Sequence, residues 1–341
     1  MKTLLWALCA GALVTSAAAQ AQVKLEKPKL SIASTNPVIS YYPFEIALAK
    51  GYFKDEGLDV ERSIFAGGSQ TTKALVGGST DMIVSAYSNT LTMATKGINL
   101  QAVVLMIKYP GFVFGITKKA MPKYKSLQDL SGMVIGVTAP GSSTNFILNS
   151  IATRNGVNPK SYSVIGVGAQ AGAAAAVREG QLDALVGIDP IITMLVDSGD
   201  FKILADLRTG PGTLAAVGAD TYPEGSLIAT ADFIKKNPNT VQAVVNAMVR
   251  ADKFLATATN EQIADALPKS YQVGTRAQYL SAIEHTRTIY SPDGRYDAKG
   301  AEAVLGVLAG SDAEIAQAQK KIDMPATYTN KFVDAAVVKT P

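Results

Sequence analysis

The chain contains a pattern that occurs twice, about 100 residues apart, and this repeat constrains the fold more than any other feature. The first copy is FAGGSQTTKALVGGSTDMIVSA at 65–86, and the second is IGVGAQAGAAAAVREGQLDALVGI at 165–188. In each copy a hydrophobic run leads to Gly-x-Gln, a helical segment of small residues, Gly-x-x-Asp and a second hydrophobic run. Short apolar runs bounded by glycine indicate buried parallel strands. The repeat is too long for a solenoid and predicts two similar lobes, each with a strand-helix-strand unit.

Stretches rich in glycine and proline predict where the chain crosses between these lobes. One is KYPG at 108–111, and the other is 209–225, which also contains several threonines. Such stretches interrupt strands and helices, so we place hinges near Tyr109 and Ser226. The predicted organisation is a signal sequence at 1–21, a first lobe made of 29–110 and 227–335, and a second lobe at 111–226.

The predicted fold class is α/β, with two lobes that each contain a mainly parallel sheet flanked by helices, joined by two hinge crossings. From residue 231 to about residue 309 the hydrophobic pattern is helical. We expect these C-terminal helices to pack on the first lobe.

The N-terminal segment 1–21 has the pattern of a cleavable secretory signal. Lys2 supplies the positive charge, 4–14 form an apolar region too short to span a bilayer, and small alanine-rich sites for cleavage follow. We therefore expect export to the periplasm. Cys9 is the only cysteine of the chain and follows Leu8 rather than a small residue, so lipid attachment is not expected.

Charge and motif content argue against several classes of function. The net charge of +4 is mild and dispersed, which does not suit nucleic-acid binding. His285 is the only histidine, and the sequence has no metal-ligand spacing, phosphate-binding loop or nucleophile elbow. The run GVGAQA at 166–171, with Asp189 after the next strand, resembles a dinucleotide fingerprint, but the first copy of the repeat lacks it. We expect no catalytic residues, no metal and no cofactor.

The turn TAPGSSTN at 138–145 is the strongest candidate for ligand binding. It joins a predicted strand to a predicted helix, and ligands of open α/β sheets bind at the carboxyl ends of strands. Ser142, Ser143 and Thr144 place hydroxyl groups beside free N–H groups at the start of a helix, which favours an anion. An ordinary helix cap would need only one of these residues. The equivalent turn of the first lobe is GGSQ at 67–70.

Several other residues are candidates because they fall at predicted strand ends. Tyr41, Tyr87 and Tyr109 could each offer a ring and a hydroxyl group to a ligand, or serve in local packing. Ser88 follows Tyr87 and could donate to a ligand oxygen. Asp189 either pairs with a ligand amine or caps the helix that Pro190 begins.

Longer motifs show a family resemblance over about 29–333. They are AxxxGYFKDEGLDV from Ala47, DLSGMVIGVTAPGSST, EGQLDALVGIDP and ADFIKKNPNTVQAVVNAMVRA. Together they resemble the periplasmic substrate-binding proteins of ABC importers, in the nitrate, sulfonate and taurine family that also includes binders of thiamine-pyrimidine precursors. The resemblance implies a two-lobed type II periplasmic binding protein that closes on a small molecule and delivers it to a membrane permease.

The resemblance and the strand-end turns together give a predicted set of ligand-binding residues. The set is Ser40, Tyr41, Gly68, Ser69, Gln70, Tyr87, Ser88, Tyr109, Gly141, Ser142, Ser143, Thr144 and Asp189. Sulfonate-binding relatives often carry a bulky aromatic residue near the position where this chain has GIDP at 187–190, so the resemblance does not assign taurine or nitrate itself. The cysteine-rich signature of the eukaryotic pyrimidine-synthesis relatives is absent, and their activity is not expected.

The sequence thus predicts a monomeric solute-binding protein whose partners are a small-molecule ligand and an ABC transporter permease. The expected ligand is a small organic anion, a sulfonate or a carboxylate with or without an aromatic ring, held by 142–144 and stacked by a tyrosine. One alternative is a neutral pyrimidine or similar heterocycle, whose ring nitrogens Asp189 and Gln70 would contact. Another is a subunit that senses the ligand for a membrane receptor, and an exported enzyme is a third.

Overall fold

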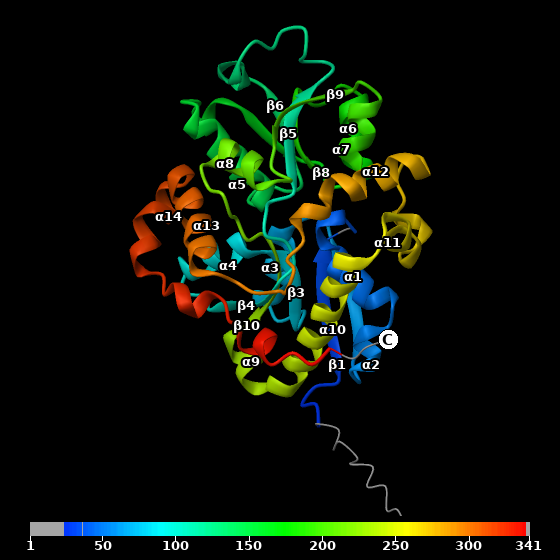
Figure 1. The fold of residues 1–341 in the computed structure, drawn as a ribbon. Coiled ribbons are helices and arrows are strands. Elements are labelled where there is room, and N and C mark those ends of the chain that lie inside the picture. The colour runs from blue at the N-terminus through cyan, green and yellow to red at the C-terminus, as the bar shows by residue number, and fades with distance from the viewer. Residues whose placement is uncertain (1–23, 36, 339–341) are drawn as a thin grey trace, which may run out of the picture.

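The computed structural model describes residues 24–35 and 37–338, so the expected signal sequence with Cys9 lies outside the described residues. Two five-stranded sheets form the centres of two lobes, one above the other in Figure 1. The first sheet contains β1 (Lys29–Thr35), β2 (Asp59–Phe65), β3 (Met82–Ala86), β4 (Leu100–Leu105) and β10 (Gly225–Thr230). The second contains β5 (Phe112–Thr117), β6 (Val134–Val137), β7 (Ser163–Gly166), β8 (Ala184–Ile188) and β9 (Phe201–Asp206).

The two sheets have the same topology. The strand order is β2-β1-β3-β10-β4 in the first sheet and β7-β6-β8-β5-β9 in the second. In each sheet the first three strands of this order are parallel, and the fourth runs antiparallel to both of its neighbours. That antiparallel strand is the one that follows a crossing between the lobes. The predicted α/β fold with two similar lobes is confirmed.

The sequence repeat corresponds to β2-α3-β3 in the first lobe and β7-α6-β8 in the second, with α3 at Gly68–Val76 and α6 at Ala171–Arg178. Its two aspartates have equivalent roles. Asp81 accepts a hydrogen bond from the backbone N–H of Ser31 at 2.9 Å, and Asp183 accepts one from Val134 at 2.9 Å. The backbone N–H of each aspartate donates in turn to the carbonyl of that same residue. The aspartate of the Gly-x-x-Asp pattern therefore bonds the start of β3 to β1 in the first lobe, and the start of β8 to β6 in the second.

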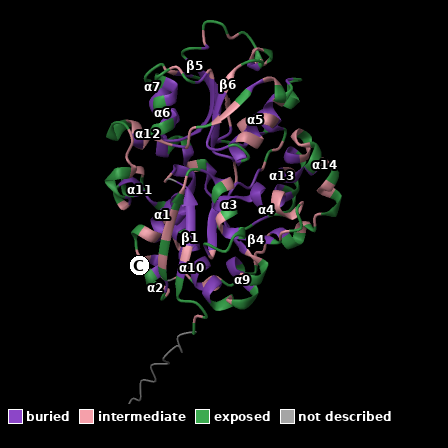
Figure 2. Cartoon of the chain, turned by 180° about the vertical axis from the view of Figure 1, so that it is seen from behind, coloured by how far each residue is buried: buried purple, intermediate pink, exposed green. Residues whose placement is uncertain are grey.

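The inner strands are covered on both faces, which explains their continuous hydrophobic runs. Every residue of β3, β5 and β8 is buried, whereas the edge strands β2 and β7 contain exposed and half-buried residues. Figure 2 shows this arrangement, with buried strands inside helices whose outer sides are exposed. Strands enclosed on both faces are typical of parallel α/β sheets.

Helices cover both sheets. Those of the first lobe include α1 (Tyr42–Ala49), α2 (Tyr52–Asp55), α4 (Tyr87–Ala94), α9 (Ala231–Lys236), α10 (Pro238–Thr257) and α15 (Lys331–Asp334). Those of the second lobe include α5 (Ser143–Arg154), α7 (Ile191–Asp197) and α8 (Gly210–Val217). The remaining C-terminal helices are α11 (Asn260–Ala266), α12 (Arg276–Thr286), α13 (Ala298–Ser311) and α14 (Ala313–Ala318). No helix in the described part of the chain is long and apolar enough to cross a membrane.

The expectation that the C-terminal helices pack on the first lobe is wrong in part. The long helix α10 does so, because it lies against α1, α2 and β4. However, α12 contacts α7 of the second lobe, and α13 contacts both α4 of the first lobe and α5 of the second. The C-terminal region therefore connects the two lobes at positions outside the two hinge crossings, an arrangement that the helical periodicity could not reveal.

Candidate functional site

A small pocket lies between the two lobes, where the strand ends of both sheets meet. Its open space is about 20 Å³, which is close to the room that a single water molecule needs. The lobes are therefore closed on each other. The residues that line the pocket are Thr35, Ser40, Tyr41, Ala66, Gly68, Ala86, Phe112, Thr138, Ser142, Ser143, Thr144, Ala169, Ile188 and Glu224.

Direct contacts between the lobes hold this closed arrangement beside the pocket. The backbone N–H of Ser69 donates to the Ser142 hydroxyl at 3.3 Å, and the Ser69 hydroxyl donates to the carbonyl of Pro140 at 3.3 Å. On the other side the Gln170 amide donates to the carbonyl of Pro37. At Gly67 a Cβ atom would lie 2.8 Å from the Cβ of Ala139, so a larger residue there would push the lobes apart.

The predicted turn at 138–145 does form part of the pocket, at the start of α5. Three of its four hydroxyl groups are already engaged within the protein, since the Thr138 and Thr144 hydroxyls lie 2.9 Å apart and the Ser142 hydroxyl is also bonded. Ser142 contacts Ser69 of the other lobe, and the Thr144 hydroxyl accepts a hydrogen bond from the N–H of Thr138 at 3.1 Å. Ser143 is left as the hydroxyl group that is available to a ligand, together with the N–H groups of the first helical turn, which have no acceptor within the helix.

Glu224 is the acidic residue of the pocket lining, and it is absent from the predicted set of ligand-binding residues. It lies just before β10, in the second crossing between the lobes, and its exposed fraction is 1%. Backbone hydrogen bonds fix its position, because its N–H donates to Ile107 at 3.0 Å and its carbonyl accepts from Tyr87 at 2.7 Å. Among the described residues, neither of its carboxyl oxygens has a hydrogen-bond partner.

The surroundings of Glu224 disfavour its charged form. Burial raises the pKa of its carboxyl group from 4.5 to about 8, and the nearby Ser143 hydroxyl opposes this rise. The carboxyl charge and burial also raise the pKa of the Tyr41 and Tyr222 hydroxyls, with burial the larger cause. At neutral pH the group is therefore mainly protonated, and it can either donate a hydrogen bond or ionise when a positive group approaches.

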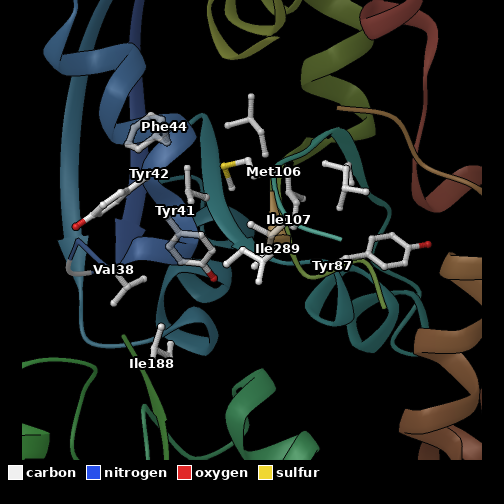
Figure 3. Close-up of a cluster of buried hydrophobic side chains, with 14 of the residues drawn as sticks. Val38, Tyr41, Tyr42, Phe44, Tyr87, Met106, Ile107, Ile188 and Ile289 are labelled. Atoms are coloured by element: carbon white, nitrogen blue, oxygen red, sulfur yellow. The ribbon is translucent and has the colours of Figure 1, made fainter. Parts of the chain in front are cut away.

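Tyr41 is placed at the pocket by a short helical segment, η1 (Ile39–Tyr41). The Tyr290 hydroxyl of the C-terminal region fixes this segment by donating to the carbonyl of Ile39 at 2.9 Å. Figure 3 shows the Tyr41 ring among apolar side chains, with Ile188 of the second lobe near it and Tyr87 on the far side of Ile107. Phe112, at the first hinge crossing, is the other ring that lines the pocket.

Two predicted tyrosines do not line this pocket. The Tyr87 hydroxyl lies 2.5 Å from the Thr327 hydroxyl, and its ring packs on Tyr296 in the interior of the first lobe. Tyr109 lies against α8, where a Cβ at Gly210 would be 2.9 Å from the Tyr109 hydroxyl. These rings stabilise their lobes, which is the packing alternative considered for each tyrosine.

Other predicted residues lie near the pocket without lining it. Ser88 is fully buried on α4, and its hydroxyl has no partner among the described residues. The exposed Gln70 accepts a hydrogen bond from the N–H of Ala66 at 3.2 Å. Ser69 and Gly141 line a wider groove of about 690 Å³, to which both lobes and α14 contribute.

Asp189 is also absent from the pocket lining, because its carboxylate is fully engaged elsewhere. One oxygen accepts from the N–H and the hydroxyl of Thr193, at 2.9 and 2.8 Å, in the first turn of α7. The other oxygen pairs with the guanidinium of Arg208 at 2.7 Å. Arg208 in turn pairs with Asp206. These contacts favour the capping role over the ligand-binding role.

The described residues offer little for metal or acid-base chemistry. No group of three or more histidine, cysteine, aspartate or glutamate side chains is placed in this part of the chain to hold a metal ion. His285 lies on α12, 3.4 Å from the Thr193 hydroxyl and outside the pocket lining. What the pocket can do chemically is to surround a small molecule with hydroxyl groups, helix N–H groups, two rings and one carboxyl group.

The fold and pocket define a class of protein. Two lobes of identical strand order, closed on each other at their strand ends, form the periplasmic binding protein fold, and solved structures of that fold superpose on this chain. The chain belongs to the NMT1/THI5-like family, whose sequence model matches residues 39–261.

Three comparisons place the chain within this class. A solved structure of a protein from Bordetella bronchiseptica RB50 is 43% identical, with a TM-score of 0.87, and the match covers 92% of this chain and 98% of that one. The alkanesulfonate-binding protein SsuA from Xanthomonas axonopodis pv. citri, bound to MOPS, is 19% identical with a TM-score of 0.66, over 90% and 100% of the two chains. The 4-amino-5-hydroxymethyl-2-methylpyrimidine phosphate synthase THI13 of Saccharomyces cerevisiae is 25% identical over 228 residues, which are 64% of each chain. The match thus spans less than two thirds of the yeast protein.

Proposed function

We propose that this chain is the solute-binding component of an ABC importer, which captures a small organic ligand between its lobes and delivers it to a membrane permease in the periplasm. The observation that carries this proposal is the pocket lined by strand-end turns of both lobes, since ligands of α/β sheets bind at such turns. A ligand held there contacts both lobes at once. It therefore stabilises the closed arrangement, which a permease can distinguish from an open one.

The anionic group of the ligand is proposed to lie at the start of α5. This helix has 12 residues, and its first turn brings free N–H groups and the Ser143 hydroxyl to the pocket. The positive end of the helix dipole favours a sulfonate or a carboxylate at this place. Tyr41 and Phe112 offer ring faces to the organic part of the ligand.

The alternative of a neutral pyrimidine cannot rest on Asp189 and Gln70, the two residues that the sequence suggested for it. Asp189 is paired with Arg208, and Gln70 is bonded to its own turn. Glu224 is the group in the pocket that could contact ring nitrogens. The yeast relatives named as pyrimidine phosphate synthases give this alternative its support, whereas the sensing alternative differs only in the protein that recognises the closed state.

The space in the pocket requires the lobes to separate when a ligand enters. About 20 Å³ accommodates one water molecule and no organic acid. Opening would break the contacts of Ser69 with Ser142 and Pro140, and of Gln170 with Pro37. Each of these hydrogen bonds, two of which join Ser69 to Ser142, is worth about 0.5–1.5 kcal/mol, so a ligand with several contacts can control the equilibrium between the two arrangements.

A thermal-shift screen tests the proposed function. The panel contains sulfonates, nitrate, aromatic carboxylates, amino acids and pyrimidines, applied after refolding to remove any bound compound. A ligand at 100 times its dissociation constant should add about 2.7 kcal/mol to the free energy of unfolding. A shift confined to one chemical class supports a binding protein. Chemical conversion of the bound compound, or no shift with any class, would contradict the proposal.

A further inference from the structure

The pocket contains a polar group that the anion-binding role leaves without a function. Glu224 has an exposed fraction of 1%, and neither of its carboxyl oxygens finds a hydrogen-bond partner in the described part of the chain. Buried polar groups are nearly always hydrogen-bonded, and a buried carboxyl group without a partner destabilises the fold. Because Glu224 also lines the pocket, the missing partner is most simply an atom of the ligand.

The groups that face Glu224 show which chemistry is missing. Its titratable neighbours are the tyrosines Tyr41 from η1, Tyr222 from the preceding segment and Tyr296 from the C-terminal region, all of them neutral at physiological pH. Ser143 of α5 is the polar neighbour from the second lobe. Arg208, which precedes the second crossing, is committed to Asp189 and Asp206. Among the residues that the structure describes, none brings a positive charge to this carboxyl group.

We propose that the ligand carries a nitrogen whose N–H group donates to the carboxyl group of Glu224, while its acidic group lies at the start of α5. This inference rests on the proposed function, since it assigns a second contact within the same pocket. Two kinds of compound provide this chemistry, a primary ammonium group and an amino group on a nitrogen-containing ring. In both, the nitrogen selects against acids that lack it.

A protonation change follows for a cationic ligand. The pKa of Glu224 is about 8, so at pH 7 the group is mainly protonated, and it must lose its proton to the solvent when an ammonium group binds. Binding at pH 7 should then release protons, which calorimetry detects as an enthalpy that depends on the ionisation enthalpy of the buffer. A neutral amino-substituted ring can pair with the protonated carboxyl group and should release none.

The test uses matched pairs of compounds that differ only in the nitrogen. They are 2-aminoethanesulfonate and ethanesulfonate, 3-aminopropanoate and propanoate, and 4-aminopyrimidine-5-carboxylate and pyrimidine-5-carboxylate. Titration calorimetry on the full chain should show at least one pair whose nitrogen-bearing member binds about 10-fold or more tightly than its partner, as expected for a hydrogen bond to a charged group. The first two pairs represent the ammonium source, and the third represents the amino-substituted ring.

Two variants test whether Glu224 causes the preference for the nitrogen-bearing compounds. Glu224→Gln should reduce the preference to about twofold or less, and because the carboxyl group has no hydrogen-bond partner to lose among the described residues, the variant should fold. The control is Asp252→Asn, which alters another buried carboxyl group without a partner, on α10 and outside the pocket. It should leave the preference unchanged.

The outcomes separate this inference from the proposed function. If the nitrogen-free acids bind as tightly as their partners, or if Glu224→Gln keeps the preference, the role of Glu224 is overturned while the binding function stands. If no compound of the panel binds to the wild-type chain, the proposed ligand class fails and this inference fails with it.

Discussion

Two buried carboxyl groups near the boundary between the lobes differ in one respect. Asp189, after β8, accepts from three hydrogen-bond donors, one of which is the guanidinium of Arg208. Glu224, before β10, has no partner among the described residues for either oxygen. Both have exposed fractions of 1% or less, so burial does not distinguish them. A buried carboxyl group whose oxygens are hydrogen-bonded within the protein therefore belongs to the scaffold. One without such partners beside a pocket points to a ligand.

The largest effect, a loss of stability, should follow from removing the carboxylate of Asp189. Asp189→Ala leaves Arg208 buried with Asp206 as its remaining partner and removes the donor contacts of Thr193. Removing one member of a buried ion pair typically destabilises a protein by about 3–5 kcal/mol. We expect a loss near the lower end of this range in urea-induced unfolding.

The matched control for that variant is Asp200→Ala. It breaks the more exposed pair of Asp200 with Arg178, whose atoms are 3.5 Å apart, and should change the free energy of unfolding by about 0–1 kcal/mol. Equal losses of unfolding free energy in the two variants would show that the contacts of Asp189 stabilise the fold no more than an exposed ion pair does.

Glu224 should instead change how the free energy of unfolding depends on pH. The pKa of Glu224 is raised from 4.5 to about 8, so its stabilising contribution is fully present below pH 4.5 and is lost as the pH rises through 8. Within that window the free energy of unfolding should fall by about 1.4 kcal/mol for each pH unit because of this group. In Glu224→Gln this slope is absent, so the variant should gain stability over the wild type between pH 5 and pH 8.

Urea titrations at pH 5, 6.5 and 8 measure this difference. The exposed Glu302→Gln variant on α13 serves as the control and should follow the wild type at all three values. A constant difference between Glu224→Gln and the wild type over the whole pH range would mean that Glu224 is not held in its protonated form.

A smaller effect is expected on ligand affinity from the start of α5. Ser143→Ala removes the hydroxyl group that the protein leaves available in the pocket. The affinity for an anionic ligand should fall by about 1 kcal/mol, or about fivefold, in titration calorimetry. Ser88→Ala removes another buried hydroxyl that lies outside the pocket and should leave the affinity unchanged. If Ser143→Ala binds as the wild type does, the anion lies elsewhere.

The smallest effect should come from a single contact between the lobes. Gln170→Ala removes the hydrogen bond to the carbonyl of Pro37 and should weaken the closed arrangement by about 0.5–1.5 kcal/mol. Small-angle X-ray scattering should then show a larger radius of gyration without ligand. Gln128→Ala, which removes a bond to Asn155 within the second lobe, is the control and should not change it. A radius unaffected by Gln170→Ala would mean that this contact does not influence closure.

The repeat made the fold predictable because its pattern depends on interactions within one strand-helix-strand unit and with the strand beside it. Hydrophobic runs bounded by glycine form buried strands, and the aspartates Asp81 and Asp183 bond to the adjacent central strand in both copies. The turn at 138–145 was also predictable, since hydroxyl residues between a strand and a helix mark a helix start. Which of its hydroxyls remains available was not, because Ser142 and Thr144 are engaged by Ser69 and Thr138 in three dimensions.

Glu224 escaped sequence analysis for a similar reason. It lies at the end of the stretch 209–225, whose composition indicates a connection between lobes, and no local pattern distinguishes it from a solvated acid. Its importance arises from distant residues that bury it, among them Tyr41 and Ser143. An acidic residue directly before an apolar strand that follows a crossing between two lobes is the one signal that could have identified it.

The most direct test of the account is to lock the lobes together. In a Cys9→Ser background, which removes the only native cysteine, Ser69→Cys with Ser142→Cys places two thiols where hydroxyl oxygens lie 3.4 Å apart across the lobes. We predict that the oxidised protein cannot admit the ligand identified by the thermal-shift screen, and that reduction restores binding. Equally fast binding by the oxidised and reduced forms would contradict a ligand site that opens between the lobes.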